Sequence, residues 1–277
     1  MSKKRREIPV FDHPIIETHC HLDYLKDRPL SDTLEQSQRV NIEKVITIAV
    51  SPDNLAAVRE LAGSADWVFG TQGIHPHEAE TYTDEVEAEI RQHATDDKIV
   101  AVGEIGLDYF YDNADRAVQR DVFRRQLQIA CDSDRPVVIH SRDADDDTIA
   151  ILKEFEHSLE RRGVIHSFTS GPGLAQYAID QGFSHFLVDT FDKTAGGLSE
   201  FFEWGELGDL CERARRGGLC FVAAGSLGAE QLGAAAAAGV DVIAVRGAAT
   251  AGVRTAAIDR QAVSGLTAGI RAALSPG

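Results

Sequence analysis

The chain alternates short, almost continuous hydrophobic runs with longer segments whose apolar positions recur every three or four residues. The short runs predict strands and the longer segments predict amphipathic helices. In Asp115–Cys131, for example, Val118, Val122 and Leu127 fall on one helix face. The Ala-rich segments Ala229–Ala238 and Ala262–Ala273 also predict helices. Nine strands are predicted: Ile15–His21, Lys44–Val50, Trp67–Gly73, Ile99–Ile105, Pro136–Ser141, Val164–Phe168, His185–Thr190, Leu219–Gly225 and Val240–Arg246.

This alternation predicts an α/β fold, most simply a (β/α)8 TIM barrel. Strands that are hydrophobic throughout are typical of parallel sheets covered on both faces, and repeated strand–helix units favour the barrel. A doubly wound open sheet is the alternative, but no Gly-rich dinucleotide turn follows the first strand. Nine predicted strands compete for the eight places of a barrel, which leaves three alternatives open: one strand is surplus, one packs outside the barrel, or one segment is not a strand.

Composition divides the chain near residue 183. Residues 184–277 hold 8 Lys+Arg and 10 Asp+Glu, whereas residues 1–183 hold 20 and 34. Nine of the ten histidines lie in the first part, and 15 of the 24 glycines lie in the second. Such a step usually marks a domain boundary, yet no Pro/Ser/Gly linker separates the parts. We therefore expect a single barrel domain, residues 1–277, built from parts 1–183 and 184–277.

Charge and cysteine usage limit the classes of function. The net charge of −16 excludes a broad basic nucleic-acid surface, but not a nuclease, because bound divalent cations supply positive charge locally. The four cysteines lack C-x-x-C spacing and are expected to be reduced. Neither a signal-peptide core nor an 18-residue apolar run is found. A cytoplasmic protein with no membrane partner is expected.

Metal-binding residue types gather at the ends of four predicted strands. His19 and His21 lie two apart, so alternation along a strand puts both on one face. Glu104, His140 and His166 end three further strands. Each alone is compatible with a hydrogen-bonded core position. Together they favour a divalent-metal site at the carboxyl ends of barrel strands, where such active sites are built.

Five motifs in order along residues 12–183 carry a resemblance to the TatD-type metal-dependent deoxyribonucleases. They are T-H-C-H-L-D (18–23), G-I-H-P-H (73–77), V-G-E-I-G-L-D-Y (102–109), P-V-V-I-H-S-R-D-A (136–144) and G-V-I-H-S-F-T-S (163–170). The resemblance implies two divalent ions (Zn, Mn or Mg) that hydrolyse phosphodiester bonds in DNA or a related substrate. It implies the metal ligands His19, His21, Glu104, His140 and His166, with Glu104 bridging the ions. It also implies that His75 faces the substrate phosphate.

One residue of the family's metal site has no counterpart in this sequence. The family completes the site with an Asp after the eighth strand, in a run like E-T-D-A-P-Y, and no such run occurs here. The eighth predicted strand instead leads into Ala223-Ala224-Gly225-Ser226. Asp189, at the end of the seventh, is the nearest substitute, while Asp241 stands at the start of a strand. We expect impaired hydrolysis.

Residues 185–272 resemble the C-terminal units of (5-formylfuran-3-yl)methyl phosphate synthase, another (β/α)8 barrel. The resemblance rests on V-D-T-F-D-K (188–193), A-A-G-S-L (223–227) and V-R-G-A-A (245–249). It implies that Asp189 and Lys193 are active-site residues, and that a phosphate is held by Gly225, Ser226, Arg246, Gly247 and Ala248. Small-residue loops after the last barrel strands commonly bind phosphate through backbone N–H groups, although tight βα turns have the same composition.

Three functions remain open from the sequence. The first is a TatD-type hydrolase acting on phosphodiesters. The second is a hybrid of two barrel families that binds metal or a phosphorylated small molecule without turnover. The third is a lysine-dependent lyase or synthase on triose phosphates, using Lys193.

Overall fold

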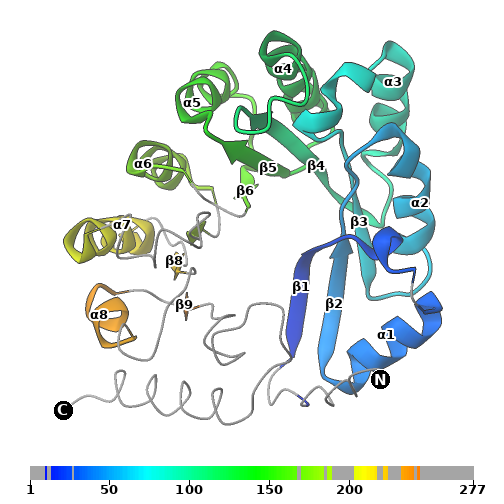
Figure 1. Ribbon diagram of the computed structural model, residues 1–277, viewed down its shortest axis with the longest axis horizontal. Coiled ribbons are helices and arrows are strands. Elements are labelled where there is room, and N and C mark those ends of the chain that lie inside the picture. The colour runs from blue at the N-terminus through cyan, green and yellow to red at the C-terminus, as the bar shows by residue number, and fades with distance from the viewer. Residues whose placement is uncertain are drawn as a thin grey trace. The chain divides into compact units, whose positions relative to one another are not determined.

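The computed structural model describes residues 10, 14–26, 28–166, 170–183, 186–188, 203–216, 221–223, 232–239 and 242–243 (Figure 1). These residues divide into two compact units: the described residues up to Val164 form the first, and those from Ile165 onward belong to the second. The first unit holds most of the regular structure and all the residues of the metal-binding cluster described below.

Strands and helices alternate along the chain. The strands are β1 (Ile15–Cys20), β2 (Ile42–Thr47), β3 (Val68–Gln72), β4 (Ile99–Asp108), β5 (Val137–Arg142), β6 (Gly163–Ile165), β7 (Phe186–Val188), β8 (Phe221–Ala223) and β9 (Val242–Ile243). The α-helices are α1 (Leu30–Arg39), α2 (Pro52–Ala62), α3 (Asp84–His93), α4 (Arg116–Asp132), α5 (Asp145–Glu154), α6 (Pro172–Asp180), α7 (Trp204–Arg216) and α8 (Leu232–Ala237). Two 3₁₀ helices are η1 (Leu22–Tyr24) and η2 (Pro76–Thr81).

All nine predicted strands are found, in two sheets. The first six strands form one sheet in the order β1-β2-β3-β4-β5-β6, and β7-β8-β9 form a second. The pairs from β1 to β5, and those from β7 to β9, are parallel. The change of sheet falls between Ile165 and Phe186, around the change in composition. The alternation of parallel strands with helices is the α/β fold of the TIM-barrel type.

The helices of the first unit lie along one side of its strands (Figure 1). From α2, Leu55 and Val58 are fully buried, and from α4 Phe123 and Leu127 are fully buried. Each such side chain contributes roughly 1.5–3 kcal/mol through its removal from water. The helix predicted for Asp115–Cys131 is confirmed as α4, and that for Ala229–Ala238 as α8; Ala262–Ala273 lies outside the described residues.

Helix α4 also carries two fully buried glutamines whose side chains bind the backbone of Asp108 and of Ile74. The Gln119 side chain accepts a hydrogen bond from the Asp108 N–H at 2.8 Å and donates to the Asp108 carbonyl at 3.1 Å. Seven residues on, Gln126 makes the same pair of bonds to Ile74, at 2.8 and 3.0 Å. A buried amide is costly unless it is hydrogen-bonded. These bonds therefore fix the end of β4 and the loop after β3 to one rigid helix.

Strand β4 is longer than predicted, running to Asp108 instead of Ile105. It stays paired with β5 through Asp108 opposite Arg142. Gly106 permits this close approach: its φ is +132°, and an added Cβ would lie 2.0 Å from the His140 carbonyl oxygen. Glu104 is skipped in the pairing, since Gly103 faces Val138 and Ile105 faces Ile139. Such a bulge re-aims the side chain of the skipped residue.

Within the described residues, no helix combines the length and the hydrophobicity that crossing a membrane would require.

Replacing Gly106 by Ala is expected to lower the free energy of unfolding by about 2 kcal/mol or more, because a non-glycine residue at this φ is strained and its Cβ meets backbone. Chemical denaturation measures the change. Gly173→Ala in α6 is the matched control: an added Cβ there has no neighbour within 4 Å, so stability should stay the same or rise slightly. Equal unfolding midpoints for wild type and Gly106→Ala would contradict the packing described for β4 and β5.

Candidate metal centre

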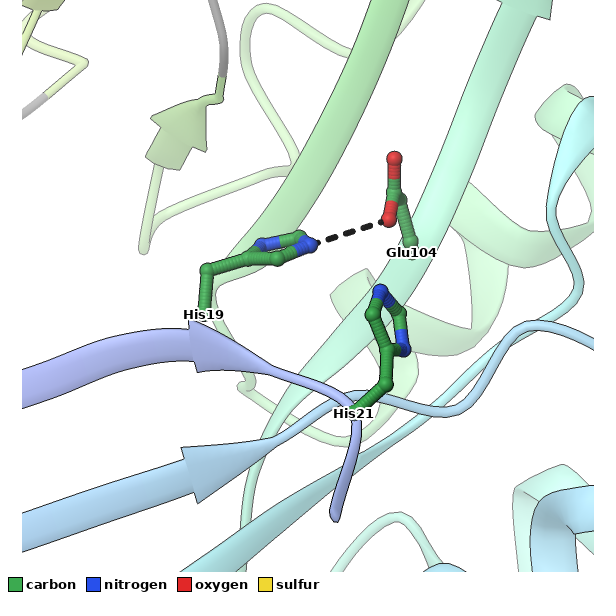
Figure 2. A group of neighbouring side chains, drawn as sticks. All are labelled: His19, His21 and Glu104. Carbon is green, nitrogen blue, oxygen red and sulfur yellow. Dashed lines mark ion pairs between the residues drawn. The ribbon is translucent and has the colours of Figure 1, made fainter. Parts of the chain in front are cut away.

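The first two histidines stand at the end of β1 and face Glu104 from β4 (Figure 2). The rings of His19 and His21 lie 5.5 Å apart, on one side of the strand as alternation predicts. Cys20, between them, points away, and its Sγ lies 3.5 Å from the Ile46 carbonyl oxygen. Burial, with the nearby charges of Glu17 and Asp23, raises the pKa of Cys20 to about 12.

Glu104 is the centre of the cluster. Its side chain is almost fully buried, and its carboxylate is reached by three imidazoles. Oε2 lies 3.2 Å from His19 Nε2, and Oε1 lies 3.1 Å from His140 Nδ1 and 3.5 Å from His75 Nε2. The bulge in β4 turns the side chain toward them, and the Glu104 N–H donates to the Ala49 carbonyl at 2.9 Å. A buried carboxylate is stable only where positive charge or donors surround it.

In two histidines, one ring nitrogen is bonded to a protein oxygen and the other faces the cluster. His21 Nδ1 donates to the Ile48 carbonyl at 3.2 Å, which leaves Nε2 with its lone pair. His140 Nε2 donates to Asp108 Oδ2 at 2.9 Å, and its Nδ1 lies 3.1 Å from Glu104 Oε1. Metal-ligating histidines usually donate their other N–H to a carbonyl or carboxylate in this way. Both rings therefore have the arrangement that a metal ligand needs.

In His75, by contrast, the ring nitrogen that faces away from the cluster accepts a hydrogen bond instead of donating one. Its Nδ1 accepts the His77 backbone N–H at 3.2 Å at the start of η2. In the neutral ring the proton therefore sits on Nε2, which points at Glu104. Burial lowers the pKa of His75, against the opposing effect of its bond to Glu104. This keeps the ring neutral, and His75 presents an N–H donor to the centre.

A buried carboxylate, Asp108, supports the cluster from behind. Its Oδ2 accepts from both His140 and His77, each at 2.9 Å, and its Oδ1 accepts the N–H groups of Phe110 at 3.1 Å and Tyr111 at 2.9 Å. Burial works against ionisation of Asp108, but these hydrogen bonds outweigh it and hold its pKa well below the usual range. Burial likewise acts to lower the pKa of His140, yet its bonds to Asp108 and Glu104 raise it to about 9.

Within the part of the chain that the structure describes, two groups of residues have ligand atoms close enough to share an ion. They are His19, His21 and Glu104, and His75, Glu104 and His140, with the ligand atoms in each group within 4.8 Å of one another. Imidazole nitrogens with a carboxylate oxygen suit Zn²⁺ or Mn²⁺. The buried charge of Glu104 and the Nε2 lone pair of His21 fit a divalent ion, which would displace the proton that His140 Nδ1 shares with Glu104. Glu104 belongs to both groups, as a bridging ligand would.

Of the sequence-predicted ligands, the structure brings together His19, His21, Glu104 and His140, with His75 beside them. His166 directly follows β6 and belongs to the second unit. The remaining predicted site residues lie outside the described residues: Asp189, Lys193, Gly225, Ser226, Arg246, Gly247 and Ala248.

Sequence reasoning missed the residues that orient the histidines. Asp108 and His77 stand inside quoted motifs, as the last D of G-E-I-G-L-D and the second H of H-P-H, but neither received a role. Gln119 and Gln126 were missed as well. Their signal was present, since two glutamines seven residues apart share the apolar face of α4.

Asp145, Asp146 and Asp147 occupy the first turn of α5, where acidic side chains are favoured. Asp147 is also bonded: its Oδ2 accepts from the Tyr109 hydroxyl at 2.6 Å and from Arg120 at 3.2 Å.

Comparison with known families gives two overlapping matches. Residues 16–193 match the model described as TatD related DNase, and residues 146–267 match that described as 4-HFC-P synthase. The first match covers more than half of the chain and contains the metal-binding cluster. The second covers less than half, and it agrees with the furan-phosphate-synthase resemblance of the C-terminal part.

Among curated proteins, the chain is 31% identical over 170 residues to one from Bacillus subtilis (strain 168) that is named "Uncharacterized metal-dependent hydrolase YabD". The match covers 61% of this chain and 66% of the relative. The chain thus spans about two thirds of the length of the curated relatives it matches, 64–67% for three of them.

Among solved structures, the TatD homologue YJJV from Escherichia coli K12 matches with a TM-score of 0.56 and 33% identity, over 62% of this chain and 67% of that one. An amidohydrolase from Saccharomyces cerevisiae matches with a TM-score of 0.57 at 19% identity, over 76% and 74%. The second likeness concerns the fold alone. From the family model, the relatives and the cluster around Glu104, the chain belongs to the TatD related DNase family of metal-dependent hydrolases.

Proposed function

We propose that the chain is a divalent-metal-dependent phosphodiesterase that cleaves DNA or a related phosphodiester at the Glu104 cluster. The proposal is carried by the hydrogen bonds that orient the histidine rings of this cluster. His21 and His140 each have one nitrogen bound to a carbonyl or carboxylate and the other aimed at the buried carboxylate of Glu104. His19, His21 and Glu104 would hold one ion, and Glu104 and His140 the other. His166 would join the second ion, by resemblance to the family.

Bound divalent ions supply the positive charge that polarises a phosphoryl oxygen and acidifies a water molecule. The protein's own groups do the rest. His75 Nε2–H, held by the His77 backbone, would donate to a phosphate oxygen. Asp108 would keep His140 in the tautomer that faces the cluster. Helix α4 would hold Ile74 and Asp108, and hence His75 and His140, in fixed positions.

We propose that hydrolysis is impaired, because the sequence lacks the family's Asp-containing run after the eighth strand.

We further propose that the chain joins a TatD-type part to a part of the furan-phosphate-synthase type in one domain. The match of residues 146–267 to the 4-HFC-P synthase model supports this idea. It also favours a second candidate function, in which the chain binds metal and a phosphorylated molecule without turnover. Hydrolysis of bis(p-nitrophenyl) phosphate and of DNA in Mn²⁺ separates the two.

Glu104→Gln is expected to abolish metal-dependent hydrolysis, because the amide removes the charge shared by both ion sites. Metal affinity should fall by more than about 100-fold, since even outer-shell substitutions cost about 10- to 100-fold. Elemental analysis and bis(p-nitrophenyl) phosphate turnover measure both effects. Glu154→Gln makes the same chemical change at a surface carboxylate bonded to Arg124 and should have no effect. Unchanged metal content in Glu104→Gln would contradict the proposed site.

Asp108→Asn is expected to weaken metal binding by about 10- to 100-fold. The amide cannot accept from His140 and His77 as a carboxylate does, so His140 loses its fixed tautomer. Equilibrium dialysis against Mn²⁺ gives the affinity independently of turnover. Asp147→Asn makes the same change at a half-exposed carboxylate bonded to Tyr109 and Arg120 and not to a histidine, and this variant should bind metal like wild type. Equal affinities of all three proteins would mean that Asp108 has no orienting role.

His75→Ala and His140→Ala are expected to have different effects on metal content. His140→Ala should lose metal, whereas His75→Ala should keep its metal content and lose roughly 100-fold in turnover, as when one donor to a developing oxyanion is removed. Metal content and turnover are measured on the same samples. Loss of metal from His75→Ala would show that this ring is a ligand and that its Nε2 carries no proton in the loaded site.

A further inference from the structure

Two aromatic side chains are exposed on the loop that follows β4. Phe110 is 50% exposed and Tyr111 is 52% exposed. Their rings are perpendicular, with centres 4.9 Å apart. The guanidinium of Arg142, a residue only 8% exposed, lies 4.1 Å from the centre of the Phe110 ring and 4.4 Å from that of Tyr111. Each ring therefore has Arg142 on one side and water on much of the rest. We call these three residues the ring platform.

The ring platform is tied to the metal-binding cluster by hydrogen bonds. Asp108 accepts the backbone N–H groups of Phe110 and Tyr111 with one oxygen and holds His140 with the other. The Tyr111 ring also meets the His77 ring edge-on, with centres 5.3 Å apart, and His77 lies 6.3 Å from His140. The exposed rings are thus fixed in position next to the site before any ligand arrives.

An exposed ring also adjoins the other group of ligands. Tyr24 is 62% exposed and stacks on His21, with ring centres 5.2 Å apart and planes inclined by 20°. Aromatic side chains are exposed beside His21 and beside the His77–His140 pair. A substrate whose phosphate is bound at Glu104 would therefore have an exposed aromatic ring near it on two sides: Tyr24 beside His21, and Tyr111 beside His77.

A nucleobase is the group whose chemistry matches these surfaces. Bases stack on aromatic faces regardless of sequence, and a guanidinium adds cation–π attraction. The chain is strongly acidic, so stacking supplies affinity that a basic groove provides elsewhere. Because the rings are already fixed, little conformational entropy is lost on binding.

We propose that Phe110 and Tyr111 are specificity-determining residues that stack on the base adjoining the bound phosphodiester. Arg142 holds the two rings in place from beneath. This inference rests on the proposed phosphodiesterase function. It adds that the site recognises a nucleobase as well as a phosphate.

The test uses a short single-stranded DNA carrying the fluorescent base 2-aminopurine, with phosphorothioate links that resist hydrolysis, in Mg²⁺. Stacking quenches this fluorophore. Wild type and Tyr111→Phe are expected to quench it equally. The double variant Phe110→Leu/Tyr111→Leu, which keeps large apolar side chains but no ring face, should lose the quenching and bind roughly tenfold more weakly. Leu25→Ala, at an equally exposed residue without a ring (52%), should behave like wild type.

A second probe has the same backbone without bases. Wild type should bind this abasic strand roughly tenfold more weakly than the normal strand, and the double variant Phe110→Leu/Tyr111→Leu should bind both alike. Quenching that persists in the double variant, equal binding of the two strands by wild type, or no binding by wild type would each overturn the inference. Binding with quenching but without hydrolysis of an ordinary phosphodiester would contradict the proposed function and leave the stacking role in place.

Discussion

The buried carboxylate of Glu104 is the constraint around which the first unit is organised. A charge in this position is costly unless cationic or donor groups surround it, and three imidazoles meet it from β1, β5 and the loop after β3. Those groups come from segments as far apart in sequence as His19 and His140. Their convergence depends on the parallel order of the strands and on the bulge that turns Glu104 toward them. A divalent ion would neutralise a charge that the fold has already buried.

The supporting shell explains why the histidines are not interchangeable. Asp108 and the Ile48 carbonyl each take an N–H from a ring that then offers its other nitrogen to the centre, whereas the His77 backbone does the opposite to His75. Helix α4 secures this shell through Gln119 and Gln126, which bind the backbone at Asp108 and Ile74. The same Asp108 carboxylate also orders the loop that carries Phe110 and Tyr111. One buried residue thus links ligand orientation with the aromatic surface beside the site.

Much of this could be predicted from sequence, for identifiable reasons. Hydrophobic runs bounded by turn residues located all nine strands, and alternation placed His19 and His21 on one face. The length of β4 could not be predicted, because it depends on Gly106 allowing close contact with β5. The roles of Asp108, Gln119 and Gln126 were missed because local patterns do not show which backbone group a buried polar side chain will meet. The tautomers of His75 and His140 likewise depend on partners far along the chain.

Anomalous diffraction from crystals of the Mn²⁺-loaded protein would locate the ions and their ligands. We expect two peaks, one on each side of the Glu104 carboxylate, with His21 bound through Nε2, His140 through Nδ1, and His75 bonded to neither ion. The absence of any peak at Glu104 would contradict the metal centre. A peak bonded to His75 Nε2 would contradict the hydrogen-bond logic on which the ligand assignment depends.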